Sequence, residues 1–76
     1  MILDNKNIAI LGLGISGYWA AKLASSRGAN VLVSDSKKNI NDLYTEELKN
    51  MGVNIELGNH SSKILDSDLI VKSPGV

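Results

Sequence analysis

The stretch that decides the fold is "IAILGLGISGYW", residues 8–19, in which an apolar run meets three closely spaced glycines. The run is short, continuous and partly β-branched, as in strands buried on both faces of a parallel sheet, so we predict a strand over residues 7–12. Apolar side chains then recur at helical spacing and predict a helix that ends at Gly28. The stripe expected to face the core consists of Ile15, Trp19, Ala20, Leu23 and Ala24.

The three glycines suit a tight connection from strand to helix that leaves room for a ligand. Gly12 permits a sharp turn, Gly14 has no Cβ to block a close approach, and Gly17 lets the helix pack closely on the strand. The first helical amides, those of Ile15, Ser16 and Gly17, have no acceptor within the helix and lie at the positive end of its dipole. We therefore predict a site for a diphosphate at this turn.

An acidic residue at the end of the next apolar run favours a nucleotide as the ligand. The run at residues 31–33 leads to Asp35, which lies 18 residues after Gly17, where nucleotide-binding domains place an acid that contacts a ribose or a base. Asp35 also fits a purely structural role, in which it ends its strand and holds a turn. Ser16 likewise fits either a phosphate donor or a cap on the helix.

The rest of the chain alternates helices and strands. We predict a helix over residues 41–51, a strand over 53–57, a short helical turn within 59–68 and a strand over 69–72. Right-handed crossovers between such elements give an α/β fold, with a parallel sheet of about four strands in the order 3-2-1-4 and helices on both faces. Residues 1–76 are expected to form a single domain, with Trp19 and Tyr44 directed toward its core.

Composition excludes several classes of function. Eight acidic and eight basic side chains cancel, so the positive charge typical of a protein that binds nucleic acid is missing. Without cysteine, and with His60 as the only histidine, the chain offers no thiolate or zinc site, and we expect no bound metal. The first residues contain no long apolar segment, so we expect neither a secretory signal nor a membrane span, and a cytoplasmic location.

Three segments converge at the carboxyl ends of the predicted strands, where open α/β sheets bind their ligands. They contain the motifs "GLGISG", "VLVSDSK" and "DLIVKSPGV". Taken together, these motifs resemble the N-terminal domain of the Mur ligases, most closely the branch that adds D-glutamate. The resemblance covers nearly all of the chain, and its most distinctive part is the final "SPGV".

The resemblance implies a Rossmann-like domain that holds the UDP part of UDP-N-acetylmuramoyl-L-alanine. It also implies an ADP-forming amide ligase that takes part in peptidoglycan synthesis and therefore in cell shape and cell division. In such a ligase a central domain binds ATP and Mg²⁺, and a third domain binds the amino acid. By position, the resemblance assigns the diphosphate to Gly14, Ile15, Ser16 and Gly17, the uracil to Asp35, Ser36 and Lys37, and the wall of the same pocket to Gly75.

The sequence departs from the complete ligase because it contains no glycine-rich segment ending in Gly-Lys-Ser or Gly-Lys-Thr. We therefore expect the N-terminal part of a three-domain enzyme, with no catalytic residues and no activity of its own. The glycine turn by itself equally permits an NAD-binding domain of an oxidoreductase or a nucleotide sensor module, and "SPGV" favours the ligase. The apolar edge at residues 69–72 is expected to favour self-association.

Overall fold

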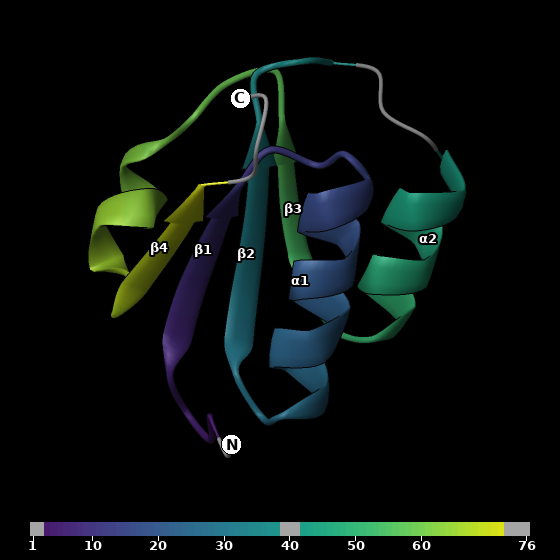
Figure 1. Ribbon diagram of the computed structural model, residues 1–76. Helices are drawn as coiled ribbons and strands as arrows, with labels where there is room; N and C mark the ends of the chain where they lie inside the picture. Colours follow the sequence, from purple (N-terminus) through teal and green to yellow (C-terminus); the bar gives the residue numbers. More distant parts are fainter. Residues whose placement is uncertain (1–2, 39–41, 73–76) are drawn as a thin grey trace.

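The computed structural model describes residues 3–38 and 42–72, and its helices and strands follow the predicted order (Figure 1). The elements are β1 (Asn7–Leu11), α1 (Ile15–Ser26), β2 (Asn30–Asp35), α2 (Asp42–Asn50), β3 (Asn54–Leu57), the 3-10 helix η1 (Ser62–Asp66) and β4 (Leu69–Lys72). Each predicted element is confirmed, with ends that differ by one or two residues.

The four strands form one parallel sheet in the order β3-β2-β1-β4, as predicted. β1 lies inside the sheet, because Ile8 is in register with Val31 on one side and with Leu69 on the other. Figure 1 shows α1 and α2 in front of the sheet on the side of β2 and β3, with η1 beside β4. The chain moves one way along the sheet from β1 to β2 to β3, and the crossover from β3 to β4 moves back the other way. Because both kinds of crossover are right-handed, η1 lies on the face opposite to α1 and α2.

Small residues place α1 close to the sheet. Gly17, Ala21 and Ala24 are buried at helical spacing, and a Cβ added at Gly17 would overlap the carbonyl oxygen of Gly12. The close approach buries the aliphatic side chains of the central strands, so Ile10 and Val33 are at most 1% exposed. The core cluster is completed by Ile8, Leu13, Tyr18, Val31, Leu48 and Val53.

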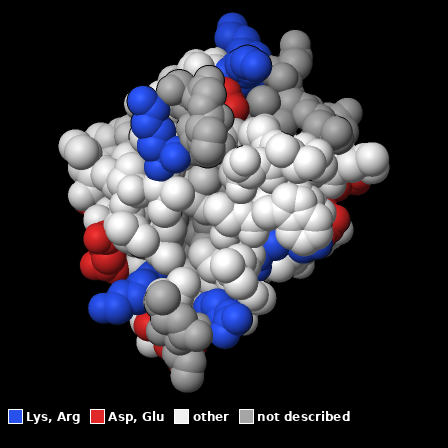
Figure 2. Space-filling view, in the orientation of Figure 1, with Lys and Arg blue, Asp and Glu red and all other residues white. Residues whose placement is uncertain are grey.

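The predicted buried stripe of α1 is wrong for its large residues. Ile15, Trp19 and Leu23 are 65%, 58% and 58% exposed, because the small residues occupy the side of the helix that meets the sheet. Figure 2 shows this face, where Lys and Arg gather mostly near the margins and the centre is largely uncharged. The prediction for Tyr44 is confirmed in part, since it is half-buried and packs against the core.

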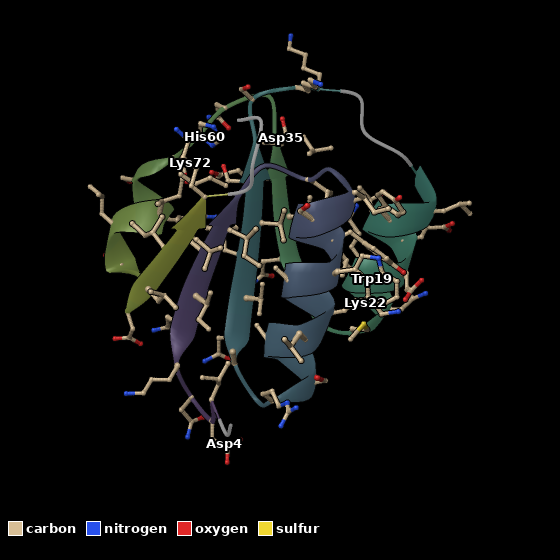
Figure 3. All side chains as sticks on the ribbon, in the orientation of Figure 1. Asp4, Trp19, Lys22, Asp35, His60 and Lys72 are labelled. Carbon is tan, nitrogen blue, oxygen red and sulfur yellow. The ribbon has the colours of Figure 1, made fainter. Side chains whose placement is uncertain are left out.

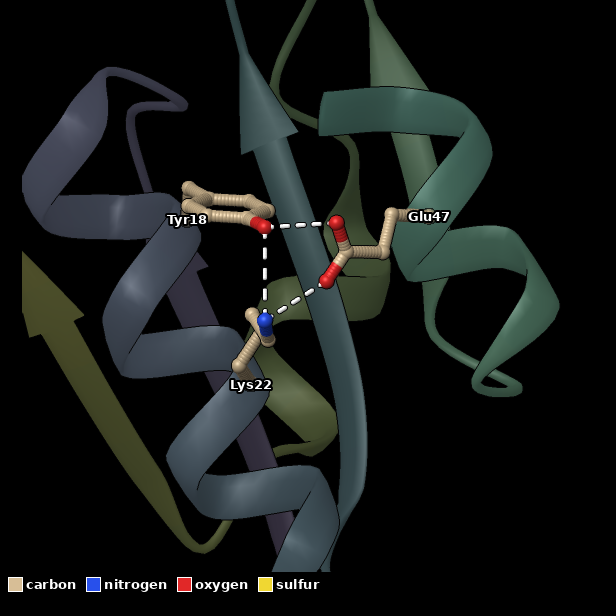
Figure 4. A network of polar contacts seen from close by, with 3 residues as sticks. All are labelled: Tyr18, Lys22 and Glu47. Atoms are coloured by element: carbon tan, nitrogen blue, oxygen red, sulfur yellow. Dashed lines mark hydrogen bonds and ion pairs between the residues drawn. The ribbon is translucent and has the colours of Figure 1, made fainter. Parts of the chain in front are cut away.

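A polar network joins α1 to α2 (Figure 4). The hydroxyl of Tyr18 donates to Glu47 Oε1 at 2.7 Å, and Lys22 Nζ lies 2.6 Å from Glu47 Oε2. The hydrogen bonds from Lys22 and Tyr18 hold the pKa of Glu47 below its ordinary value. The ring of Tyr18 also stacks on Tyr44, with centroids 4.3 Å apart, so polar and aromatic contacts together fix the angle between the two helices.

Gly17→Ala is expected to destabilise the fold, because the added methyl group would overlap the Gly12 carbonyl oxygen and push α1 away from the sheet. The expected loss is about 1–3 kcal/mol in the free energy of unfolding, measured with urea. Leu23→Ala, at an exposed position of the same helix, is the matched control and is expected to change the free energy of unfolding by about 0.5 kcal/mol or less. Equal stabilities for the two variants would contradict the close packing at Gly17.

Candidate functional site

The glycine turn connects β1 to the amino end of α1 at the carboxyl edge of the sheet. Gly12 has φ of +99°, which is accessible to glycine and strained for other residues, and its amide donates to the Ser34 carbonyl at 2.7 Å. Gly14 is the residue at the helix start, and neither a side-chain cap nor an acidic residue occupies the first turn. The positive end of the helix dipole is therefore offset by no acid of that turn.

The space above Gly14 is open. Apart from Gly14 itself and its two chain neighbours, no protein atom that the structure describes lies within 4 Å of where its Cβ would be, and its φ of −96° is available to any residue. Neither packing nor backbone conformation among the described residues therefore requires glycine at this position. A ligand that approaches the start of α1 closely does provide a reason.

Asp35 ties this turn to the end of β2. Its carboxylate is 9% exposed; Oδ2 accepts from the Leu13 amide and Oδ1 from the Lys37 amide, both at 2.8 Å. Burial by itself raises the pKa of Asp35, but the two amide donors outweigh it and hold the pKa below its ordinary value. The structural role considered for Asp35 is thus present, and each oxygen retains a second lone pair that a ligand donor can use.

The remaining predicted site residues divide by exposure. The structure exposes Gly14, Ile15, Ser16, Ser36 and Lys37, whereas Gly17 is buried where α1 meets the sheet. The exposed residues lie in two segments that the Leu13–Asp35 hydrogen bond joins. Gly75 lies outside the described residues, so its predicted role stays a prediction.

A second carboxylate organises the neighbouring strand end, and the sequence analysis did not anticipate it. Glu56 on β3 accepts from the Ser61 amide at 2.7 Å, from the Ser61 hydroxyl at 2.5 Å and from the buried Ser34 hydroxyl at 2.7 Å. These donors, those of Ser61 first, lower the pKa of Glu56 to about 2. His60 Nδ1 lies 2.6 Å from the same Ser34 hydroxyl, so the loop after β3 is anchored to β2.

A hollow of about 470 Å³ lies elsewhere, over the amino-terminal parts of β1, β2 and β3 and beside η1. Its lining includes Leu32, Glu56 and Lys63 and none of the predicted site residues, so it does not coincide with the predicted nucleotide site. Within residues 3–38 and 42–72, no group of three or more His, Asp or Glu side chains is placed to hold a metal ion. No helix in that part of the chain is long and apolar enough to cross a membrane.

The family model described as "Mur ligase MurD-like, N-terminal domain" matches residues 6–76. The chain belongs to this MurD-like family. Relatives include UDP-N-acetylmuramoylalanine–D-glutamate ligases of Staphylococcus aureus strains JH9, Newman and Mu3, each 45% identical over 75 residues, or 97% of this chain. The MurD-like chain spans 17% of the length of these relatives.

Asp35→Ala is expected to loosen the glycine turn of this MurD-like domain, because the buried Leu13 amide would lose its acceptor. The expected loss is about 1–3 kcal/mol in the free energy of unfolding, measured with urea. Amide exchange at Leu13 should also accelerate. Asp66→Ala, which removes an exposed aspartate from η1, serves as the control. Unchanged exchange at Leu13 in the Asp35 variant would contradict the proposed tie.

Glu56→Gln is expected to destabilise the domain by about 1 kcal/mol at pH 7, after allowance for solvent screening. Because folding lowers the pKa of Glu56 to about 2, its stabilisation is present above the unfolded value of about 4.3 and is lost as the pH falls toward 2. Urea titrations from pH 7 to pH 2 should therefore show that the free energies of unfolding of the unsubstituted chain and of Glu56→Gln converge as the pH falls. Glu46→Gln, on the exposed side of α2, is the control, and a pH-independent difference for Glu56→Gln would contradict the assignment.

Proposed function

We propose that this chain binds the UDP part of UDP-N-acetylmuramoyl-L-alanine. On this proposal it acts within an ADP-forming ligase that adds D-glutamate during peptidoglycan synthesis in the cytoplasm. The observation that carries the proposal is the open approach to the start of α1 above Gly14, where the described structure gives no other reason for a glycine. Family membership and the names of the relatives support the choice of ligand.

The diphosphate is assigned to the first turn of α1. The amides of Ile15 and Ser16 are at the start of a 12-residue helix, where the macrodipole favours an anion. Ser16 is exposed and adds a hydroxyl that can donate to a phosphate oxygen. This part of the site therefore supplies dipoles and neutral donors, which suit a diphosphate that keeps part of its hydration.

The nucleoside is assigned to the carboxyl end of β2. Asp35 follows this strand directly, and Ser36 and Lys37 are exposed beside it. The hydrogen bond between Asp35 and Leu13 fixes this segment relative to the glycine turn, so the groups for the base and for the phosphates keep a constant spacing. Figure 3 shows Asp35, His60 and Lys72 at this end of the sheet and Asp4 at the opposite end.

ATP and Mg²⁺ belong to the longer ligase on this proposal. The residues of this chain do not fit them, because the sequence has no Gly-Lys-Ser or Gly-Lys-Thr segment and the described residues gather no metal-binding group. By itself the chain is therefore expected to bind the nucleotide sugar without hydrolysing ATP or forming an amide.

UDP is expected to bind the chain more tightly than NAD. Gly14→Ala is expected to weaken the affinity for UDP at least about tenfold, because the new methyl group would occupy the approach to the helix amides. Calorimetric titration of both ligands against both proteins measures this. The free energy of unfolding of Gly14→Ala, expected to be nearly unchanged, serves as the internal control. Tighter binding of NAD would instead favour the oxidoreductase alternative.

A further inference from the structure

The hydroxyl of Ser34 has more hydrogen-bond partners than it has protons. It is fully buried on β2 and lies 2.7 Å from Glu56 Oε2, 3.1 Å from the Asn59 carbonyl oxygen and 2.6 Å from His60 Nδ1. A serine hydroxyl donates one hydrogen bond and accepts through its lone pairs. The chemistry of the three partners therefore decides which one receives the proton.

Two of the partners act as acceptors only. The Glu56 carboxylate is ionised at neutral pH, since its pKa is lowered to about 2, and the Asn59 carbonyl has no proton to give. If Ser34 donated to His60 instead, its oxygen lone pairs would face a carboxylate oxygen at 2.7 Å with no proton between them. The Ser34 proton is therefore directed toward Glu56, and the short contact with His60 requires Nδ1–H as the donor.

The assignment of these hydrogen bonds determines the tautomer of a neutral His60 ring. A neutral ring that carries its proton on Nδ1 has an unprotonated Nε2, which accepts hydrogen bonds. His60 is exposed, and no described residue makes a hydrogen bond to Nε2. The ring stands at the same end of the sheet as Asp35 (Figure 3).

We infer that Ser34 and Glu56 hold His60 as the Nδ1–H tautomer, so that His60 Nε2 accepts a hydrogen bond from a donor on the nucleoside of the bound nucleotide. The donor is the imide N–H of uracil or the 2′-hydroxyl of the ribose. The inference rests on the proposed UDP site and adds to it a residue from the loop between β3 and η1. Asp35, whose two oxygens already accept from Leu13 and Lys37, then shares the recognition of the nucleoside with a second acceptor.

The tautomer is tested first, in the chain without ligand. Long-range ¹H–¹⁵N correlation spectra of the imidazole above pH 8 distinguish protonated from unprotonated ring nitrogens. The expected spectrum has a protonated Nδ1 and an unprotonated Nε2 at His60, and Ser34→Ala is expected to shift the population toward Nε2–H. A ring that is mainly the Nε2–H tautomer in the unsubstituted chain would overturn the inference, whatever the ligand.

The contact is tested by calorimetry with UDP, N3-methyl-UDP and 2′-deoxy-UDP. His60→Asn keeps a donor for Ser34 and removes the Nε2 acceptor, so it should weaken UDP about three- to tenfold while leaving pyrophosphate binding and stability nearly unchanged. The analogue that lacks the donor should bind the unsubstituted chain about three- to tenfold more weakly than UDP does. The same analogue should bind His60→Asn no more weakly than UDP binds that variant, and this result identifies the donor. Ser62→Ala, at the exposed first residue of η1, is the control for UDP affinity.

The outcomes separate this inference from the proposed function. If UDP binds and Gly14→Ala weakens it, but His60→Asn binds UDP as tightly as the unsubstituted chain does, the contact at His60 is overturned and the UDP site stands. If the unsubstituted chain shows no saturable binding of UDP, the proposed function and the contact fall together. Additive losses for His60→Asn and both analogues would likewise overturn the contact.

Discussion

The hydrogen bond between the Asp35 carboxylate and the Leu13 amide joins the two segments on which the candidate site depends. One segment follows β1 and the other ends β2, and this bond adds a side-chain contact to the Gly12–Ser34 backbone hydrogen bond and the pairing of the strands. The carboxylate is buried, so it is stable as an anion only because two amides donate to it. A charged group that must be satisfied in this way gives the glycine turn one position relative to β2.

A carboxylate that accepts several hydrogen bonds also lies near the carboxyl end of β3. Glu56 gathers donors from Ser34 and Ser61, and this draws the loop after β3 toward β2. In both places an acidic side chain at or near a strand end accepts hydrogen bonds from a neighbouring loop. The rim of the sheet is therefore held by two anions bonded mainly to neutral donors, an arrangement that fixes loops which have little apolar surface of their own to bury.

The strands, the helices and the strand order could be predicted from the sequence, because continuous apolar runs mark the strands of a parallel sheet and glycines mark where strands and helices end. The sequence misled us about α1, where large apolar residues were expected to face the core. Gly17 and Ala21 do so instead, together with Ala24, which was predicted to, since the side of the helix that meets the sheet this closely favours small residues. Size, rather than hydrophobicity, was the informative property on that helix.

Spacing predicted the place of Asp35 in the candidate site but not its partner, because a backbone amide leaves no signal in the sequence. The contact of Ser34 with Glu56 depends on the register of β2 with β3, in which these two residues are paired. His60 enters through that contact, whereas in the sequence, as the only histidine, it argued only against a zinc site. Its neighbours become visible only when the strands are aligned, since Ser34 and His60 are far apart along the chain.

The position of β1 inside the sheet also has a consequence for synthesis on the ribosome. β1 is made before both of its partners, which are β2, soon after it, and β4, the last strand of the described chain. Until Leu69 and its neighbours have been made, the Ile8 edge of the nascent sheet has no partner. An unpaired edge next to an apolar core is a place where chains associate wrongly, so this domain is more open to misassociation before β4 has been made than afterwards.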